Sequence, residues 1–170
     1  MATAIKIFGA STQSRDGDLT PCRERNMETI SDLVHGFATQ DIDRIMGHFA
    51  EDALYYDIMG RGWQGTEMRG KAAIRAAFIR QFAIAGRHTY AASNLLADET
   101  KGFASWTLIL GDPSDSKSTK YAGIDEFIFD QQGLVASKRA WLKSVPALAR
   151  NIIWNNPVGL IPQLRYLVKG

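Results

Sequence analysis

Residues 118–142 read STKYAGIDEFIFDQQGLVASKRAWL, two runs of strand-forming residues separated by the turn sequence DQQG. β-Branched and aromatic residues favour a pleated, half-buried surface, and the short polar connection favours a tight reversal of the chain. Two similar runs precede this pair at residues 88–97 and 102–111, and turn signals again separate them. Four such runs in succession predict a meandering antiparallel sheet.

The sequence before residue 87 predicts three helices. Apolar residues recur at helical spacing from Met27 onward, with Asn26 as the expected N-cap, and Asp41 is the expected cap of a second, short helix. The expected buried positions are Met27, Ile30, Leu33, Val34 and Phe37 in the first helix, Ile42, Ile45, Met46 and Phe49 in the second, and Ile74, Ala77, Phe78 and Phe82 in the third. Residues 53–57 read as a strand, and the glycine-dense residues 60–70 read as a loop. Helices followed by a sheet predict an α+β fold with the helices on one face.

The two ends of the chain lack the regular helix and strand patterns of its middle. We predict an irregular N-terminal arm over residues 1–26, one folded domain over 27–145 and an apolar C-terminal arm over 146–170. Pro157 and Pro162 interrupt any long helix in the last segment. Its apolar residues would cover the body of the protein or a second subunit, close over a pocket, or touch a membrane surface, and the sequence leaves these three alternatives open.

Composition excludes several classes of protein. The chain has 170 residues, 45% of them hydrophobic, and a formal net charge of +2, which is too small to indicate a nucleic-acid partner. Cys22 is the only cysteine, and no apolar run has the length of a signal peptide or a membrane span, so we expect a cytoplasmic protein without an integral membrane segment. His35, His48 and His88 lack the spacing of a zinc site, so we expect neither metal nor cofactor.

Two aspartates stand out because apolar residues surround them. Asp57 ends an aromatic strand-forming run. Asp125 shares a strand face with Phe127 and Phe129, because side chains alternate across a sheet. If that face is buried, loss of water would raise the pKa of Asp125. The alternative, in which Asp125 faces solvent and Ile128 lies inside, is equally compatible with the sequence.

Three segments together resemble a known superfamily. They are residues 37–57, FATQDIDRIMGHFAEDALYYD, residues 69–78, RGKAAIRAAF, and residues 124–142, IDEFIFDQQGLVASKRAWL. They resemble the ketosteroid isomerase and SnoaL-like polyketide cyclase branch of the nuclear transport factor 2-like superfamily. This resemblance implies a cone-shaped barrel, in which three N-terminal helices pack on a strongly curved mixed or antiparallel sheet around an apolar pocket.

The resemblance also implies roles for individual residues. Asp57 falls where the isomerases carry a general base, and Asp125 falls where they carry a protonated aspartic acid that donates to an oxyanion. Leu33 stands where those isomerases place an oxyanion-binding tyrosine, so Tyr55 or Tyr90 would have to supply a hydroxyl. The expected substrate-binding residues are Leu33, Phe37, Tyr55, Phe78, Tyr90 and Phe127.

These features predict a cofactor-independent isomerase or cyclase of secondary metabolism. Asp57 and Asp125 would transfer protons on a hydrophobic, polycyclic carbonyl compound. Dehydration in the same pocket is one alternative, and a non-catalytic carrier of hydrophobic ligands or a dimerisation module is the other. We also expect a homodimer, formed by the outer face of the sheet, on which Trp106 and Trp141 would lie.

Overall fold

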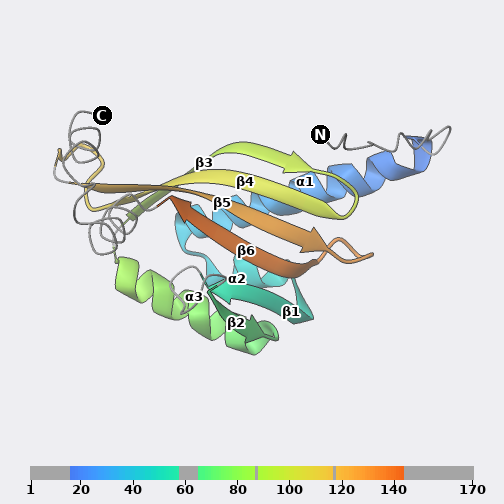
Figure 1. The fold of residues 1–170 in the computed structure, drawn as a ribbon, viewed down its shortest axis with the longest axis horizontal. Helices are drawn as coiled ribbons and strands as arrows, with labels where there is room; N and C mark the ends of the chain where they lie inside the picture. The colour runs from blue at the N-terminus through green and yellow to red at the C-terminus, as the bar shows by residue number, and fades with distance from the viewer. Residues whose placement is uncertain (1–15, 58–64, 87, 117, 144–170) are drawn as a thin grey trace, which may run out of the picture.

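The computed structural model describes residues 16–57, 65–86, 88–116 and 118–143 (Figure 1). The predictions for the C-terminal arm, residues 146–170, and for residues 1–15 lie outside the described residues. Within them the chain forms α1 (Asp16–Thr39), α2 (Ile42–Gly47), β1 (Phe49–Asp57), β2 (Thr66–Arg69), α3 (Lys71–Ala85), β3 (His88–Ala97), β4 (Lys101–Leu110), β5 (Thr119–Phe129) and β6 (Val135–Lys143). No helix among these residues has the length and apolar character needed to cross a membrane.

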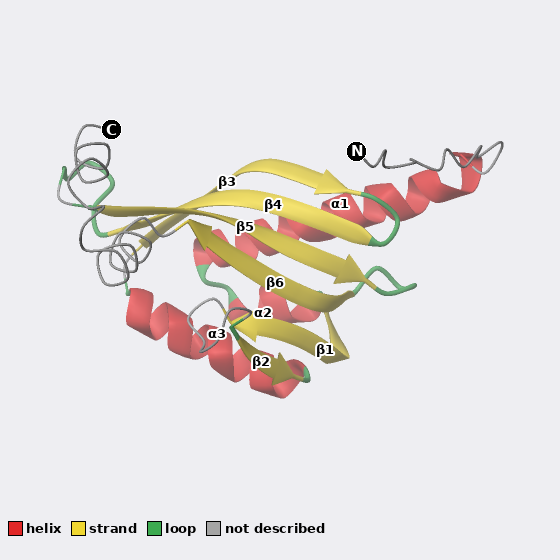
Figure 2. Ribbon diagram, viewed as in Figure 1, coloured by secondary structure: helices red, strands yellow, loops and turns green. Residues whose placement is uncertain are grey.

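All six strands belong to one mixed sheet, in the order β2-β1-β6-β5-β4-β3. Strands β3 to β6 form the predicted antiparallel meander, while β1 pairs with β6 in parallel and β2 pairs with β1 in the antiparallel direction. The sheet bends, is not closed, and has the three helices packed on its inner side (Figure 2). The predicted α+β fold is confirmed.

The core lies between the helices and the inner face of the sheet. On β5 this face carries Asp125, Phe127 and Phe129, which are 3%, 0% and 6% exposed, whereas Ile128 is 40% exposed. The alternative in which Asp125 faces solvent is therefore wrong. The largest fully buried side chains come from all layers of the fold and include Ile30, Leu33, Phe49, Tyr55, Ile74, Phe78, Phe127 and Val135.

The prediction of an irregular arm is wrong for residues 16–26, because α1 begins at Asp16 and continues through Pro21. Asn26 is not a helix cap. It is fully buried within α1, and its side-chain amide donates hydrogen bonds to the carbonyls of Asp98 and Glu99 in the turn between β3 and β4, at 2.9 and 3.1 Å. These contacts are distant in sequence, so the local pattern did not reveal the longer helix.

Two further boundaries differ from the prediction. Phe49 enters the core from the start of β1 and not from α2, although Asp41 caps α2 as predicted by accepting from the Arg44 amide. Residues 66–69, expected in a loop, form the edge strand β2. Gly65 directly precedes this strand and has a φ of +83°. A Cβ at Gly65 would lie 2.1 Å from the carbonyl oxygen of Asp57 in β1. Only glycine allows this close approach.

Trp141 is 45% exposed on the outer face, as predicted, but the prediction for Trp106 is wrong. Trp106 is 6% exposed and points inward, where its ring centroid lies 5.7 Å from that of Tyr90. The indole fits because Gly123, its partner on β5, has no side chain: a Cβ on Gly123 would lie 2.2 Å from Trp106 Cζ2. The register of β4 with β5 thus turns Trp106 inward, and the glycine opposite it leaves room for the indole.

We predict that Gly123→Ala destabilises the protein by about 1–3 kcal/mol, because the added methyl group would overpack a filled site. Gly47→Ala is the matched control, since a Cβ at Gly47 meets no atom within 4 Å. Urea denaturation would measure both. An unchanged midpoint for Gly123→Ala would show that Trp106 does not occupy this position.

Candidate active site

The structure brings the predicted substrate-binding residues together on the inner side of the sheet. Phe37 from α1 and Tyr55 from β1 both contact Phe78 of α3, with ring centroids 5.3 and 4.9 Å away. Tyr90 from β3 lies 5.9 Å from Phe37. One apolar cluster contains all six residues: Leu33, Phe37, Tyr55, Phe78 and Phe127 within it, and Tyr90 packed against it.

Asp57 lies at the edge of this cluster as the last residue of β1. The side-chain amide of Gln81, from α3, donates to Asp57 Oδ1 at 2.7 Å and to the Tyr55 hydroxyl at 2.8 Å. Asp57 is half-buried, so its carboxylate stays accessible while Gln81 restricts its orientation. This is a suitable arrangement for a general base.

Asp125 lies deeper and has a charged partner. Lys138 of β6 places Nζ 2.9 Å from Asp125 Oδ1, and both residues are only 3% exposed. The Tyr90 hydroxyl donates to Asp125 Oδ2 at 3.4 Å. Burial, followed by the charge of Asp125 and this hydrogen bond, raises the pKa of Tyr90 far above its usual value, so its phenol stays protonated at neutral pH.

Aromatic rings surround the remaining sides of the Lys138 ammonium. Its Nζ lies 5.2, 5.3 and 5.8 Å from the ring centroids of Phe37, Tyr55 and Phe127. Such contacts are favourable because the face of an aromatic ring is electron-rich. The ammonium is thus held in an apolar setting by one carboxylate and three rings.

The two aspartates share the inner face of the sheet. Tyr55 pairs with Lys138 across β1 and β6, which places Asp57 level with Ala140, and Ala140 pairs with Asp125 across β6 and β5. Two strand spacings of about 4.8 Å therefore separate their backbones, or about 10 Å in all. This arrangement places a carboxylate at one end and the hydrogen-bond donors Lys138 and Tyr90 at the other, and proton transfer on a carbonyl compound would require groups of these two kinds.

Sequence reasoning missed Lys138 and Gln81. Strict alternation from Val135 would direct Lys138 outward, but Phe129 pairs with Val135 while Ile128 pairs with Ser137. This irregularity inserts an extra residue in β6, so that Val135 and Lys138 both face the core although they are three positions apart. No local pattern reveals such a shift.

Comparison with known proteins confirms the resemblance. The family model described as "SnoaL-like domain" matches residues 30–138, which is more than half of the chain. The chain belongs to the SnoaL-like domain family. No curated protein matches it.

Solved structures support the same fold for this SnoaL-like chain. A putative ketosteroid isomerase from Kribbella flavida DSM 17836 has a TM-score of 0.59 at 17% identity, over 72% of this chain and 81% of that one. Bal32a, from a soil-derived mobile gene cassette, has a TM-score of 0.62 at 20% identity, over 75% of this chain and 95% of Bal32a. SalBIII, an epoxide hydrolase/cyclase-like enzyme of pyran ring formation in the polyether salinomycin, has a TM-score of 0.55 at 19% identity. The match covers 71% of this chain and 92% of SalBIII. At these identities the likeness establishes the fold and not the reaction.

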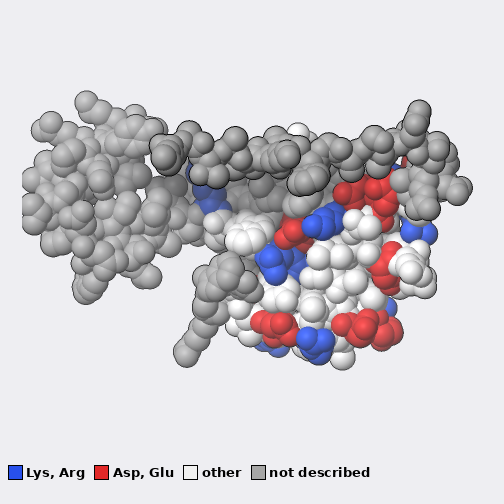
Figure 3. Space-filling model, turned by 45° about the vertical axis from the view of Figure 1, so that its right-hand side comes forward, with Lys and Arg blue, Asp and Glu red and all other residues white. Residues whose placement is uncertain are grey.

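An open groove of ≈ 590 Å³ also lies on the outside of α1 and α2 in the SnoaL-like domain, and it contains none of the predicted site residues. Its lining is polar and charged: Arg25, Glu28, Thr29, Ser31, Asp32, His35, Arg44 and His48. Acidic and basic side chains are interspersed on the face that Figure 3 shows. We prefer the inner face as the candidate active site because it gathers both aspartates and all six predicted binding residues, whereas Asp32 in the groove already forms an ion pair with Arg44.

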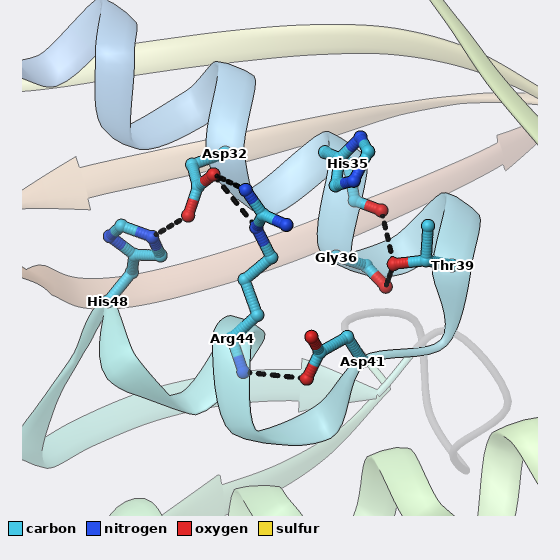
Figure 4. Close-up of polar contacts among 7 residues, drawn as sticks. All are labelled: Asp32, His35, Gly36, Thr39, Asp41, Arg44 and His48. Atoms are coloured by element: carbon cyan, nitrogen blue, oxygen red, sulfur yellow. Dashed lines mark hydrogen bonds and ion pairs between the residues drawn. The ribbon is translucent and has the colours of Figure 1, made fainter.

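Asp32 is the centre of a network of polar contacts in this groove (Figure 4). Its Oδ1 accepts from Arg44 Nη2 at 2.6 Å, and its Oδ2 lies 2.6 Å from His48 Nε2. The hydrogen bonds from Arg44 and then His48 lower the pKa of Asp32 from 3.8 to about 2. This network links α1 to α2 and to the residue that precedes β1.

We predict that the Asp32 network stabilises the fold fully above about pH 4 and is lost as the pH falls towards 2, because the pKa of Asp32 is lower in the folded state than in the unfolded state. The effect should be modest, since solvent screens this partly exposed side chain. Urea denaturation from pH 7 to pH 2 should show a smaller acid-dependent loss for Asp32→Asn than for the wild type. Asp52→Asn, at an exposed position, is the control, and equal losses in the Asp32 variant and the wild type would contradict the prediction.

Proposed function

We propose that this SnoaL-like protein is a cofactor-independent isomerase or cyclase that acts on a hydrophobic, polycyclic carbonyl compound. The observation that carries the proposal is the placement of Asp57 and Asp125 on one inner sheet face, bordered by aromatic side chains. The half-buried Asp57 is the base, and the deeply buried Asp125 marks the end at which the carbonyl oxygen binds.

The proposed chemistry begins with removal of a proton beside the carbonyl group. Asp57 takes the proton, the C–H electron pair forms the enolate, and negative charge develops on the oxygen near Asp125 and its partners. In an isomerase, Asp57 returns the proton to a different carbon. In a cyclase, the enolate carbon attacks a second carbonyl group of the same substrate, the π bond of that carbonyl breaks, and its oxygen takes the proton from Asp57 to become a hydroxyl group. A positioned general base contributes about 10²- to 10⁴-fold in rate.

Dehydration is a second candidate because the half-buried Asp57 can take a proton beside the carbonyl group and return it to a hydroxyl group on the next carbon, which then leaves as water while the C=C bond forms. A non-catalytic carrier is the third, since Asp125 and Lys138 already neutralise each other and could serve only to shape an apolar pocket. These alternatives differ in what they require of Asp57: a dehydratase needs its carboxylate for turnover, and a carrier does not.

Exchange of carbon-bound protons tests the base without knowledge of the natural substrate. We predict that the protein accelerates exchange of the α-protons of 2-tetralone, a bicyclic ketone, in D₂O, and that Asp57→Asn lowers this acceleration by about 10²- to 10⁴-fold. Proton NMR would measure the exchange, and quenching of tryptophan fluorescence would measure ketone binding. Asp52→Asn is the matched control, because Asp52 is an exposed aspartate on the same strand.

Retained binding with loss of exchange in Asp57→Asn would support a catalytic base. Binding without accelerated exchange in the wild type would favour the carrier instead.

We further propose that the protein forms a homodimer through the outer face of the sheet. Five large apolar side chains are exposed there at 40–65%: Leu96, Phe103, Ile124, Ile128 and Trp141. A patch of this kind on a monomer is unusual and marks an interaction surface.

Ile124→Lys should halve the mass measured by light scattering, because it puts a charge in the middle of this face, between Ser105 and Trp141. Ile84→Lys is the control, since Ile84 is exposed on α3 and not on the sheet. A wild-type protein that is monomeric at micromolar concentration would exclude the dimer.

A further inference from the structure

Lys138 is a buried cation that the proposed reaction has not yet used. An ammonium group carries three hydrogen-bond donors. Among the described residues, Asp125 is the only ion-pair partner recorded for Lys138, and its other neighbours are the rings of Phe37, Tyr55 and Phe127. Rings attract a cation without accepting a conventional hydrogen bond, so donor capacity remains.

We infer that the Lys138 ammonium is the group that binds and stabilises the substrate oxygen, and that Asp125 is the residue that positions it. This inference rests on the proposed function and assigns one step within it. It replaces the neutral aspartic acid that the family resemblance implies for Asp125, and it fills the role for which Leu33 has no polar group.

The contacts of Asp125 support this assignment. Its Oδ1 lies 2.9 Å from the Lys138 ammonium, and its Oδ2 accepts from the Tyr90 hydroxyl at 3.4 Å. Oδ1 is therefore held by an ion pair, and Oδ2 is held by a hydrogen bond that it accepts. A carboxyl group that donated to a ligand would have to give up one of these contacts.

The surroundings of Lys138 suit an oxyanion. Donors aimed at developing charge are most effective where water is excluded and where they need not reorient during the reaction. Lys138 is 3% exposed, and its ion pair with Asp125 limits the movement of its ammonium group. The three rings also favour a flat, unsaturated ligand, because they present aromatic surface beside the ammonium.

The proton balance is simple. Asp57 removes the α-proton and becomes a carboxylic acid, while the C–H electron pair moves to form the enolate. The enolate oxygen accepts a hydrogen bond from the Lys138 ammonium, which keeps its proton. Asp57 then delivers its proton to another carbon, and the carbonyl group reforms without any co-reactant.

A phenol that mimics the enolate tests the inference. 2-Naphthol has distinct absorption spectra as the phenol and the phenolate, so its ionisation on the protein can be followed by pH titration. A cation at hydrogen-bond distance favours the phenolate. We therefore expect bound 2-naphthol to ionise about one to three pH units lower in the wild type than in Lys138→Met/Asp125→Asn.

The double variant removes both charges, so no uncompensated charge remains buried if Lys138→Met alone fails to fold. Asp125→Asn keeps the ammonium, and it should keep the low ionisation of the ligand. Lys143→Met should behave as the wild type, because Lys143 is an exposed lysine on the same strand.

Equal naphthol ionisation in the wild type and the double variant would overturn the role of Lys138 while leaving the proposed function intact. The same holds if Asp125→Asn alone abolishes the shift and Lys138→Met retains it, since Asp125 would then be the donor. If 2-naphthol does not bind to the wild type at all, the apolar carbonyl site itself is wrong, and the proposed function fails together with this inference.

Discussion

The parallel pairing of β1 with β6 is the constraint on which the rest of the structure depends. It joins the helical first half of the chain to the antiparallel meander of the second half, across about 80 residues of sequence. Because Tyr55 pairs with Lys138, the same register places Asp57 on the level of Asp125. A slip by one residue would turn one set of these side chains to the outer face. Both the core and the candidate site therefore require this one register.

The buried ion pair between Asp125 and Lys138 carries a large desolvation cost within this fold. Transfer of two charges from water into an apolar core costs several kcal/mol per ion, and the attraction between the charges offsets this only with good geometry and further hydrogen bonds. The 2.9 Å ion pair, the hydrogen bond from the Tyr90 hydroxyl to Oδ2 and the three rings offset part of this cost. A pair of apolar residues would fill the same space at lower cost, so stability of the fold alone does not account for these charges.

The polar groups of the site are supported by different layers of the fold. Gln81 reaches Asp57 and Tyr55 from α3, whereas Phe37 of α1 contacts both Tyr90 and the Lys138 ammonium. The Asp32 network in turn holds α2 against α1, just before β1 begins. The helices thus restrict different parts of the candidate site, which limits the movement of its donors and acceptors.

The sequence by itself determined the fold class, the four strands of the meander, the α2 cap at Asp41 and the set of aromatic residues that cluster around the site, because these follow from local periodicity and turn chemistry. The sequence left the orientation of Asp125 open. It wrongly predicted a helix cap at Asn26 and an outward Trp106, and it did not reveal that Lys138 is buried in the candidate site. Those three outcomes depend on partners distant in the chain: the β3–β4 turn for Asn26, the register of β4 with β5 for Trp106, and the irregular register of β6 for Lys138. Tertiary structure alone decided them, because the face on which a strand residue lies depends on its pairing with neighbouring strands as well as on its own neighbours in sequence.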